Sequence, residues 1–155
     1  MKWIDGNELD TSQFSGKELC EKLSTEMYDL SKEQRLQCDA VLQNAMLIID
    51  FDTETSMEGF STPYIGNFTA DDYARIINAF REIGDTHDAE ILSEALRLDA
   101  EYTGLLERTD TDGYDRIYDE FCDQLDKLEQ ELYLNTDFDM WAMLFRYLDE
   151  QLGRQ

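Results

Sequence analysis

A regular row of carboxylates runs along the stretch 114–134, beside an equally regular row of apolar side chains. The carboxylates of Asp115, Asp119, Asp123 and Asp126 recur every three or four residues, a spacing that places them on one stripe of an α-helix. The helical rise separates neighbours by roughly 5–6 Å along the axis. One strand of duplex DNA carries a phosphate about every 3.4 Å, so two adjacent rows would approach that density. The row predicts attraction of a cationic surface, and the alternative is an ordinary solvated helix face.

The segment around this row is strongly acidic. Residues 99–139 contain fourteen acids, and their only bases are Arg108, Arg116 and Lys127. This imbalance predicts a concentrated acidic patch instead of an evenly charged surface. The candidate partner-binding residues are Asp99, Glu101, Asp110, Asp112, Asp115, Asp119, Asp123 and Asp126.

The whole chain shares this excess of acids. Its 155 residues include 36 acids and 13 bases, which gives a formal charge of −23. Such a charge disfavours direct binding to nucleic acid, where Lys and Arg must replace phosphate counterions, and it disfavours an anionic membrane. Hydrophobic residues make up 42% and aromatic residues 12% of the chain, which is enough to form a core. We therefore expect a basic protein as the partner, with adaptation to high salt as the alternative explanation of the charge.

Neither export nor membrane insertion is predicted. The first residues lack the apolar run of a signal peptide, and the longest apolar run, 45–49, is far too short to span a bilayer. The cysteines Cys20, Cys38 and Cys122 are odd in number and lack a C-x-x-C spacing, which favours reduced thiols. We expect a cytoplasmic protein.

Helix start signals precede the apolar-periodic stretches, and strand-like alternation is absent. The sequence therefore predicts an all-α protein, a single domain of about six helices packed around a central apolar helix. Residues 1–14 would form an N-terminal arm and residues 15–155 the acidic helical domain. The expected helices are 15–30, 31–52, 69–84, 85–102, 114–134 and 136–153, with 31–52 at the centre.

The loop expected over 56–68 combines turn residues with apolar rings. It holds the only proline and two glycines, yet also Phe60, Tyr64 and Phe68. A solvated loop rarely carries so many apolar rings. We therefore expect the loop to pack against the domain, with Phe60 and Tyr64 buried.

No catalytic, metal or cofactor site is predicted. His87 is the only histidine, so paired-histidine metal motifs are ruled out, and its place near a helix N-terminus favours a surface or capping role. A glycine-rich phosphate loop and a G-x-S-x-G elbow are absent. In an EF-hand register set by Gly113, Arg108 would occupy the first ligand position, so that register fails. A metal-dependent enzyme built on a cluster of carboxylates remains an alternative.

The loop and its flanking helices resemble those of a known family. The segments EGFSTPYIGN (58–67), FREIGD (80–85) and AEILSEAL (89–96) follow a long apolar helix. This order resembles the bacterial DNA-mimic protein family, whose members are small, acidic and all-helical and carry a loop of the type N-G-G-F-x-x-Y-x-x-N. Met57 and Glu58 stand where that pattern has Asn and Gly. The matching residues, which we expect to shape the loop, are Gly59, Phe60, Tyr64 and Asn67.

The resemblance implies a homodimer whose acidic surface occupies the DNA-binding face of a transcription regulator. Together with the charge pattern, it leads us to expect a non-enzymatic acidic protein that binds a basic, nucleic-acid-binding protein and blocks its site by DNA-like charge mimicry. An immunity protein that neutralises a basic toxin nuclease is an alternative with the same physics. The metal-dependent enzyme is the alternative from a different class.

Overall fold

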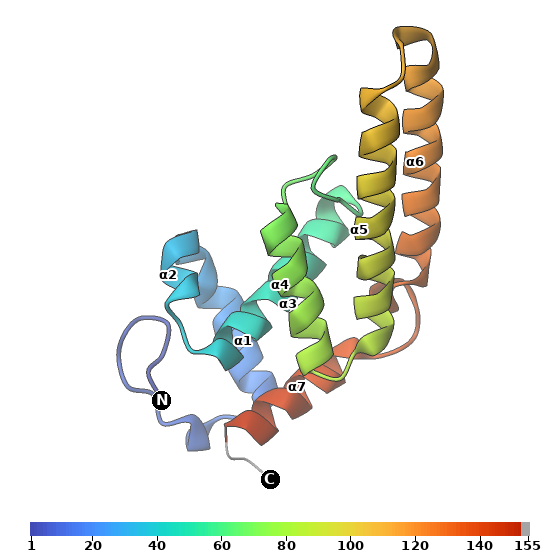
Figure 1. The fold of residues 1–155 in the computed structure, drawn as a ribbon. Coiled ribbons are helices and arrows are strands. Elements are labelled where there is room, and N and C mark those ends of the chain that lie inside the picture. Colours follow the sequence, from blue (N-terminus) through green and yellow to red (C-terminus); the bar gives the residue numbers. More distant parts are fainter. Residues whose placement is uncertain (153–155) are drawn as a thin grey trace.

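The computed structural model describes residues 1–152, and this part of the chain is helical without a named strand (Figure 1). The predicted all-α class is confirmed, with seven α-helices instead of about six. Three short 3-10 helices, Thr11–Gln13, Met27–Asp29 and Tyr133–Asn135, complete the described structure. The α-helices are α1 (Gly16–Glu26), α2 (Lys32–Leu36), α3 (Ala40–Glu58), α4 (Ala70–Glu82), α5 (Thr86–Glu107), α6 (Thr111–Glu131) and α7 (Met140–Gln151).

Helix α3 is the central apolar helix. Its side chains Leu42, Ile48 and Phe51 are almost fully buried, and it packs against α1, α4 and α7. The helix continues six residues beyond the expected end at Asp52 and stops at Gly59. Gly59 has a φ of +86°, a conformation that L side chains rarely adopt, so the glycine sets the end of the helix.

The helix expected over 31–52 is two helices, α2 and α3, which corrects the predicted number. Asp39 caps the second helix by accepting a hydrogen bond from the backbone N–H of Val41 at 2.9 Å. The amide of Gln43 donates to the carbonyl oxygens of Leu36 and Cys38, at 3.1 and 2.7 Å. These bonds satisfy carbonyls that a continuous helix would have used, and so stabilise the break.

Helices α5 and α6 lie side by side and extend well beyond the other helices (Figure 1). Helix α5 continues past the expected end at Tyr102 and ends at Glu107. Gly104 lies inside this helix and does not end it. A single glycine costs a helix only about 1 kcal/mol, and Leu106, two residues further on, is buried. We call α5 and α6 the hairpin, and α1 to α4 with α7 the body.

The loop between α3 and α4 belongs to the body and contacts the hairpin. Phe60 is 8% exposed and meets Phe51 edge-on, with ring centroids 6.2 Å apart, so its predicted burial is confirmed. The predicted burial of Tyr64 is wrong, because its side chain is 38% exposed. The Tyr64 ring rests edge-on against Phe121 of α6, and its hydroxyl lies 2.5 Å from that of Tyr114.

The N-terminal residues and α7 close the other end of the body. Trp3 is buried, and its indole N–H donates to Glu26 at 3.2 Å. The backbone N–H of Gly16 donates to Asp149 of α7 at 2.7 Å. Helix α7 begins at Met140, four residues later than expected, and Gly153, its expected end, lies outside the described residues.

Two further properties bear on where the protein could act. None of the helices in residues 1–152 is long and apolar enough to cross a membrane. Cys20, Cys38 and Cys122 are free thiols.

Candidate functional site

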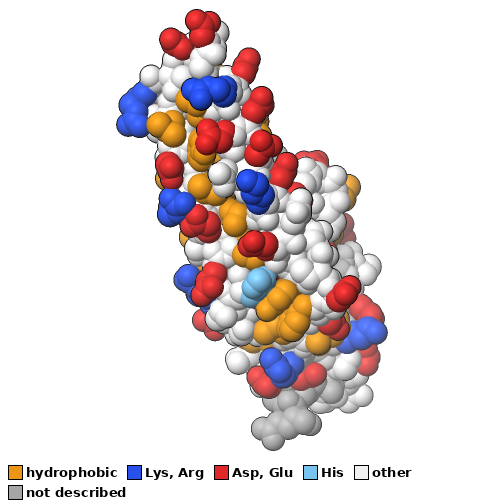
Figure 2. All heavy atoms as spheres, turned by 90° about the vertical axis from the view of Figure 1, so that its right-hand side faces the viewer, with side chains coloured by type: hydrophobic (Ala, Val, Ile, Leu, Met, Phe, Trp, Pro, Cys, Tyr) orange, Lys and Arg blue, Asp and Glu red, His pale blue; other side chains and the backbone are white. Residues whose placement is uncertain are grey.

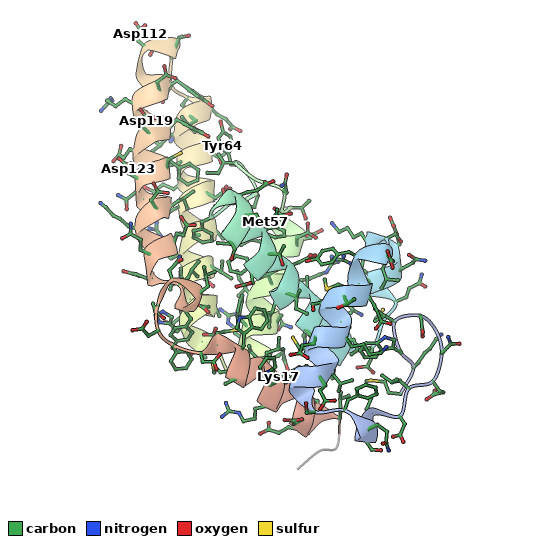
Figure 3. The ribbon with its side chains drawn as sticks, turned by 180° about the vertical axis from the view of Figure 1, so that it is seen from behind. Lys17, Met57, Tyr64, Asp112, Asp119 and Asp123 are labelled. Atoms are coloured by element: carbon green, nitrogen blue, oxygen red, sulfur yellow. The ribbon has the colours of Figure 1, made fainter. Side chains whose placement is uncertain are left out.

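Helix α6 presents the predicted row of carboxylates to solvent. Asp110 caps the helix by accepting a hydrogen bond from the Gly113 N–H at 3.2 Å. From Asp112 to Asp126 the helix rises about 21 Å. Figure 3 places Asp112 at the tip of the hairpin, with Asp119 and Asp123 projecting from the side of α6 that faces away from α5. The exposed row consists of Asp110, Asp112, Asp115, Asp119, Asp123 and Asp126.

These six carboxylates have no ion-pair partner in residues 1–152. The hairpin does carry bases, and Figure 2 shows blue side chains among the red ones along it. Arg116 and Lys127 of α6, however, form no ion pair with the acids within the same range. The row therefore keeps its charge available to a partner.

Helix α5 carries Asp99 and Glu101, which were expected to extend the row, and the structure corrects Asp99, because its side chain is buried. Asp99 is 8% exposed, and its carboxylate accepts a hydrogen bond from the Tyr64 N–H at 2.9 Å. Glu101 is exposed but pairs with Arg97 at 2.8 Å, and the same guanidinium pairs with Glu94 at 2.5 Å. The charged surface of the hairpin therefore comes mainly from α6.

Aromatic packing holds α6 in place behind its acidic face. Phe121 is fully buried and stacks on Tyr102 of α5, with ring centroids 5.1 Å apart. Tyr114 and Tyr118 stack further along α6 at 6.3 Å. The hydrogen bond between the hydroxyls of Tyr64 and Tyr114 raises the pKa of Tyr64 to about 12. The row is thus carried by a straight helix that is anchored along its length.

The loop residues named from the sequence serve the fold. Gly59 ends α3, and the side-chain amide of Asn67 donates to Glu54 and Glu58 of that helix, at 3.4 and 3.2 Å. Phe60 fills the core. Of these loop residues, Tyr64 touches α6 through its ring and hydroxyl, and the backbone N–H of Phe60 donates a hydrogen bond to the carboxylate of Glu129 in α6.

A ring stack at the base of the hairpin was not predicted from the sequence. His87 of α5 stacks on Tyr133, with centroids 4.2 Å apart, and Tyr133 stacks on Phe138 at 4.0 Å. Nε2 of His87 donates to the carbonyl oxygen of Glu131 at 2.8 Å. The expected surface position of His87 is confirmed, but its contact with residues far along the chain had no signal in the local pattern.

Two buried carboxyls lie beneath this stack. Asp85 and Asp88 are 1% and 3% exposed, and the Tyr133 N–H donates to Asp88 at 3.0 Å. Burial, together with the hydrogen bond and the charge of Asp85, raises the pKa of Asp88 to about 8, although the Tyr133 N–H opposes the shift. Oδ2 of Asp85 is buried without a hydrogen-bond partner within residues 1–152.

Potential metal ligands and cavities are further features of the described residues that could form a site. Residues 1–152 contain no group of three or more His, Cys, Asp or Glu side chains placed to hold a metal ion. A cavity of about 380 Å³ lies between α2, α3 and α4, over Met46. Its cations Lys32 and Arg35 already pair with Asp72 and Asp50, at 2.8 and 2.5 Å.

Comparison with known proteins corrects the resemblance named from the loop. Neither the curated proteins nor the solved structures gave a match. The model of a protein family does match, over residues 36–151. That family is described as DMP19-like proteins, a different family from the bacterial DNA-mimic family expected, so the earlier assignment is wrong. Because the match covers about three quarters of the chain, the protein belongs to the family of DMP19-like proteins.

Proposed function

We propose that this is a non-enzymatic acidic protein that binds a basic, nucleic-acid-binding protein and blocks its site by DNA-like charge mimicry. The observation that carries the proposal is the row of unpaired carboxylates from Asp110 to Asp126 on a projecting helix. A cationic groove that binds phosphates would be attracted to such a row. The partner is then a protein whose own nucleic-acid site is rich in Lys and Arg.

The geometry suits part of one DNA strand. Neighbouring carboxylates in the row lie roughly 5–6 Å apart along the helix axis, against about 3.4 Å between phosphates of one strand. The row is therefore sparser than DNA, but it is rigid and already ordered before binding. Because little conformational freedom remains to be lost, such a surface binds with a smaller entropic cost than a flexible acidic tail.

The position of the row favours blocking over simple attachment. The hairpin extends beyond the body, so α6 can enter a concave basic surface while the body stays outside it (Figure 1). The net charge of −23 adds long-range attraction, which speeds encounter with a cationic protein. We expect association to slow steeply as salt rises, while dissociation changes less.

The test compares two variants that each remove four negative charges. One carries Asp115→Asn, Asp119→Asn, Asp123→Asn and Asp126→Asn. The matched control carries Glu21→Gln, Asp29→Asn, Glu82→Gln and Glu150→Gln, which change exposed acids of the body. The partner is isolated with the parent protein, and each version is then titrated against it at low and high salt.

We expect the row variant to bind at least tenfold more weakly than the parent at low salt, about 1.4 kcal/mol. The body variant should lose much less affinity for the partner. The parent should also displace a DNA or RNA ligand from the partner, and the row variant should not. Equal binding by the row variant and the parent would overturn the proposal, as would a partner that binds both nucleic acid and this protein at once.

A further inference from the structure

The ring stack His87–Tyr133–Phe138 ends in an open aromatic face. Tyr133 lies between the other two rings, with interplanar angles of 20° and 23°. Phe138 has Tyr133 on one side only and is 49% exposed. Its other face is therefore free to contact a partner.

Negative charge surrounds this face. Asp137 and Asp139 flank Phe138 in the chain, and both are exposed. Burial raises the pKa of the Tyr133 hydroxyl, and the charge of the nearby Asp85 adds to the rise, which places negative charge on the inner side of the stack as well. An aromatic face in a negative field attracts cations, and a planar guanidinium stacks on it better than an ammonium does.

The same chain already uses this interaction elsewhere. The guanidinium of Arg35 lies over the ring of Tyr28, 5.3 Å from its centroid. The ammonium of Lys22 lies 5.5 Å from the centroid of the Trp3 ring. In both cases the cation comes from the body itself, whereas no cation lies over Phe138 in the described part of the chain.

The stack lies on the same face of the molecule as α6. Figure 2 shows His87 in pale blue beside gathered apolar side chains, below the acidic side chains of the hairpin. The chain passes directly from the end of α6 at Glu131 into Tyr133. A partner that lies along the row would therefore reach the stack at the base of the hairpin.

We propose that the open face of Phe138 is an anchor site for an arginine side chain of the basic protein partner. This inference rests on the proposed function, because it assigns the chemistry of one contact within that interface. The row would supply long-range attraction, and the stacked arginine would supply a fixed point of contact. Interfaces commonly concentrate their binding energy in such aromatic and arginine contacts.

The test uses a short arginine-rich peptide and a lysine-rich peptide of the same length and charge. Parent protein should bind the arginine peptide more tightly. Phe138→Leu keeps an apolar side chain but removes the ring. This change should weaken binding of the arginine peptide about two- to fivefold and reduce the difference in affinity between the arginine and lysine peptides. Phe138→Tyr should restore both. Tyr28→Leu is the matched control, because Tyr28 is 50% exposed and its ring already holds Arg35.

Chemical-shift mapping by NMR locates the contact and separates the two proposals. We expect the arginine peptide to shift the ring signals of His87, Tyr133 and Phe138 along with the amides of α6. Shifts along α6 alone, with unchanged arginine preference in Phe138→Leu, would overturn the anchor and leave the row. Loss of arginine preference in Phe138→Leu, with full binding by the row variant, would support the anchor and overturn the row.

Discussion

The body and the outer helix of the hairpin, α6, differ in how their acids are paired. In the body, Asp50 and Asp72 pair with Arg35 and Lys32 and lie in partly covered positions. In α6, the acids of the row are exposed and remain unpaired within residues 1–152. With 13 bases available for 36 acids, many acids must lack a basic partner. The positions of the unpaired acids on the surface are therefore what can indicate a binding site. Pairing in the body serves packing, whereas the bare charge on α6 has no such role.

The two regions also differ in how they bury apolar side chains. Helix α3 of the body buries seven residues and α5 of the hairpin buries nine, while α6 buries only Phe121 and Leu125. The low burial is therefore confined to the outer helix α6, whose outward face is left free. The loop between α3 and α4 contacts both regions, with Phe60 on Phe51 of the body and Tyr64 on α6 of the hairpin, and so allows the two regions to be compared within one segment.

The largest expected effect comes from that loop. Phe60→Ala should lower the free energy of unfolding by about 3–5 kcal/mol, because the ring packs on Phe51 in the core. Tyr64→Ala should cost about 1 kcal/mol, because its partly exposed ring loses one edge contact and one hydrogen bond on the hairpin. Urea unfolding followed by circular dichroism measures both. Equal losses would contradict the separation of body and hairpin.

Start signals for helices were readable from the sequence because they are local. Ser15, Ser31 and Thr69 each cap a helix, as expected of a Ser or Thr that directly precedes an apolar-periodic stretch. The break between α2 and α3 was not readable, since it depends on Gln43 reaching back to Leu36. Helix existence is a local property, whereas the point at which a helix ends depends on contacts made elsewhere.

The candidate site shows the same limit. The row on α6 followed from helical spacing alone, and the clamp of Arg97 on Glu94 and Glu101 could also have been found by that rule. The burial of Asp99 could not, because its partner Tyr64 lies 35 residues away. The ring stack joins residues from two separate parts of the chain, so no periodic pattern predicts it.

The second prediction concerns pH at the junction of the two regions. The raised pKa of Asp88, about 8, means that this carboxyl binds its proton more tightly in the folded state than in the unfolded chain, where the value is near 4. Stability from this group is therefore present at low pH and is lost as pH rises toward 8. Ordinary carboxylates are already ionised above about pH 6, so the part of the slope between pH 6 and 8 that a non-titrating side chain at position 88 removes reports this pair.

We expect the free energy of unfolding to fall between pH 6 and 8 by at most about 1.4 kcal/mol per pH unit. Asp88→Asn should flatten this slope, because the amide can still accept from the Tyr133 N–H and donate to Asp85 without titrating. Thermal unfolding at a series of pH values gives the comparison. An identical slope in parent and variant would show that Asp88 is ionised throughout.

The smallest expected effects compare the same substitution in the two regions. Asp50→Asn should cost about 1–2 kcal/mol, because it removes the charged partner of Arg35 Nη1, and this partly buried guanidinium already has an Nε without a hydrogen-bond partner among the described residues. Asp119→Asn should instead add a few tenths of a kcal/mol, because it removes like-charge neighbours at Asp115 and Asp123. Added salt screens exposed charges, so the gain at Asp119 should shrink at high salt more than the loss at Asp50 does. Urea unfolding at two salt concentrations gives all four values, and destabilisation by Asp119→Asn would mean that the row carboxylate contributes to folding and is not held free for a partner.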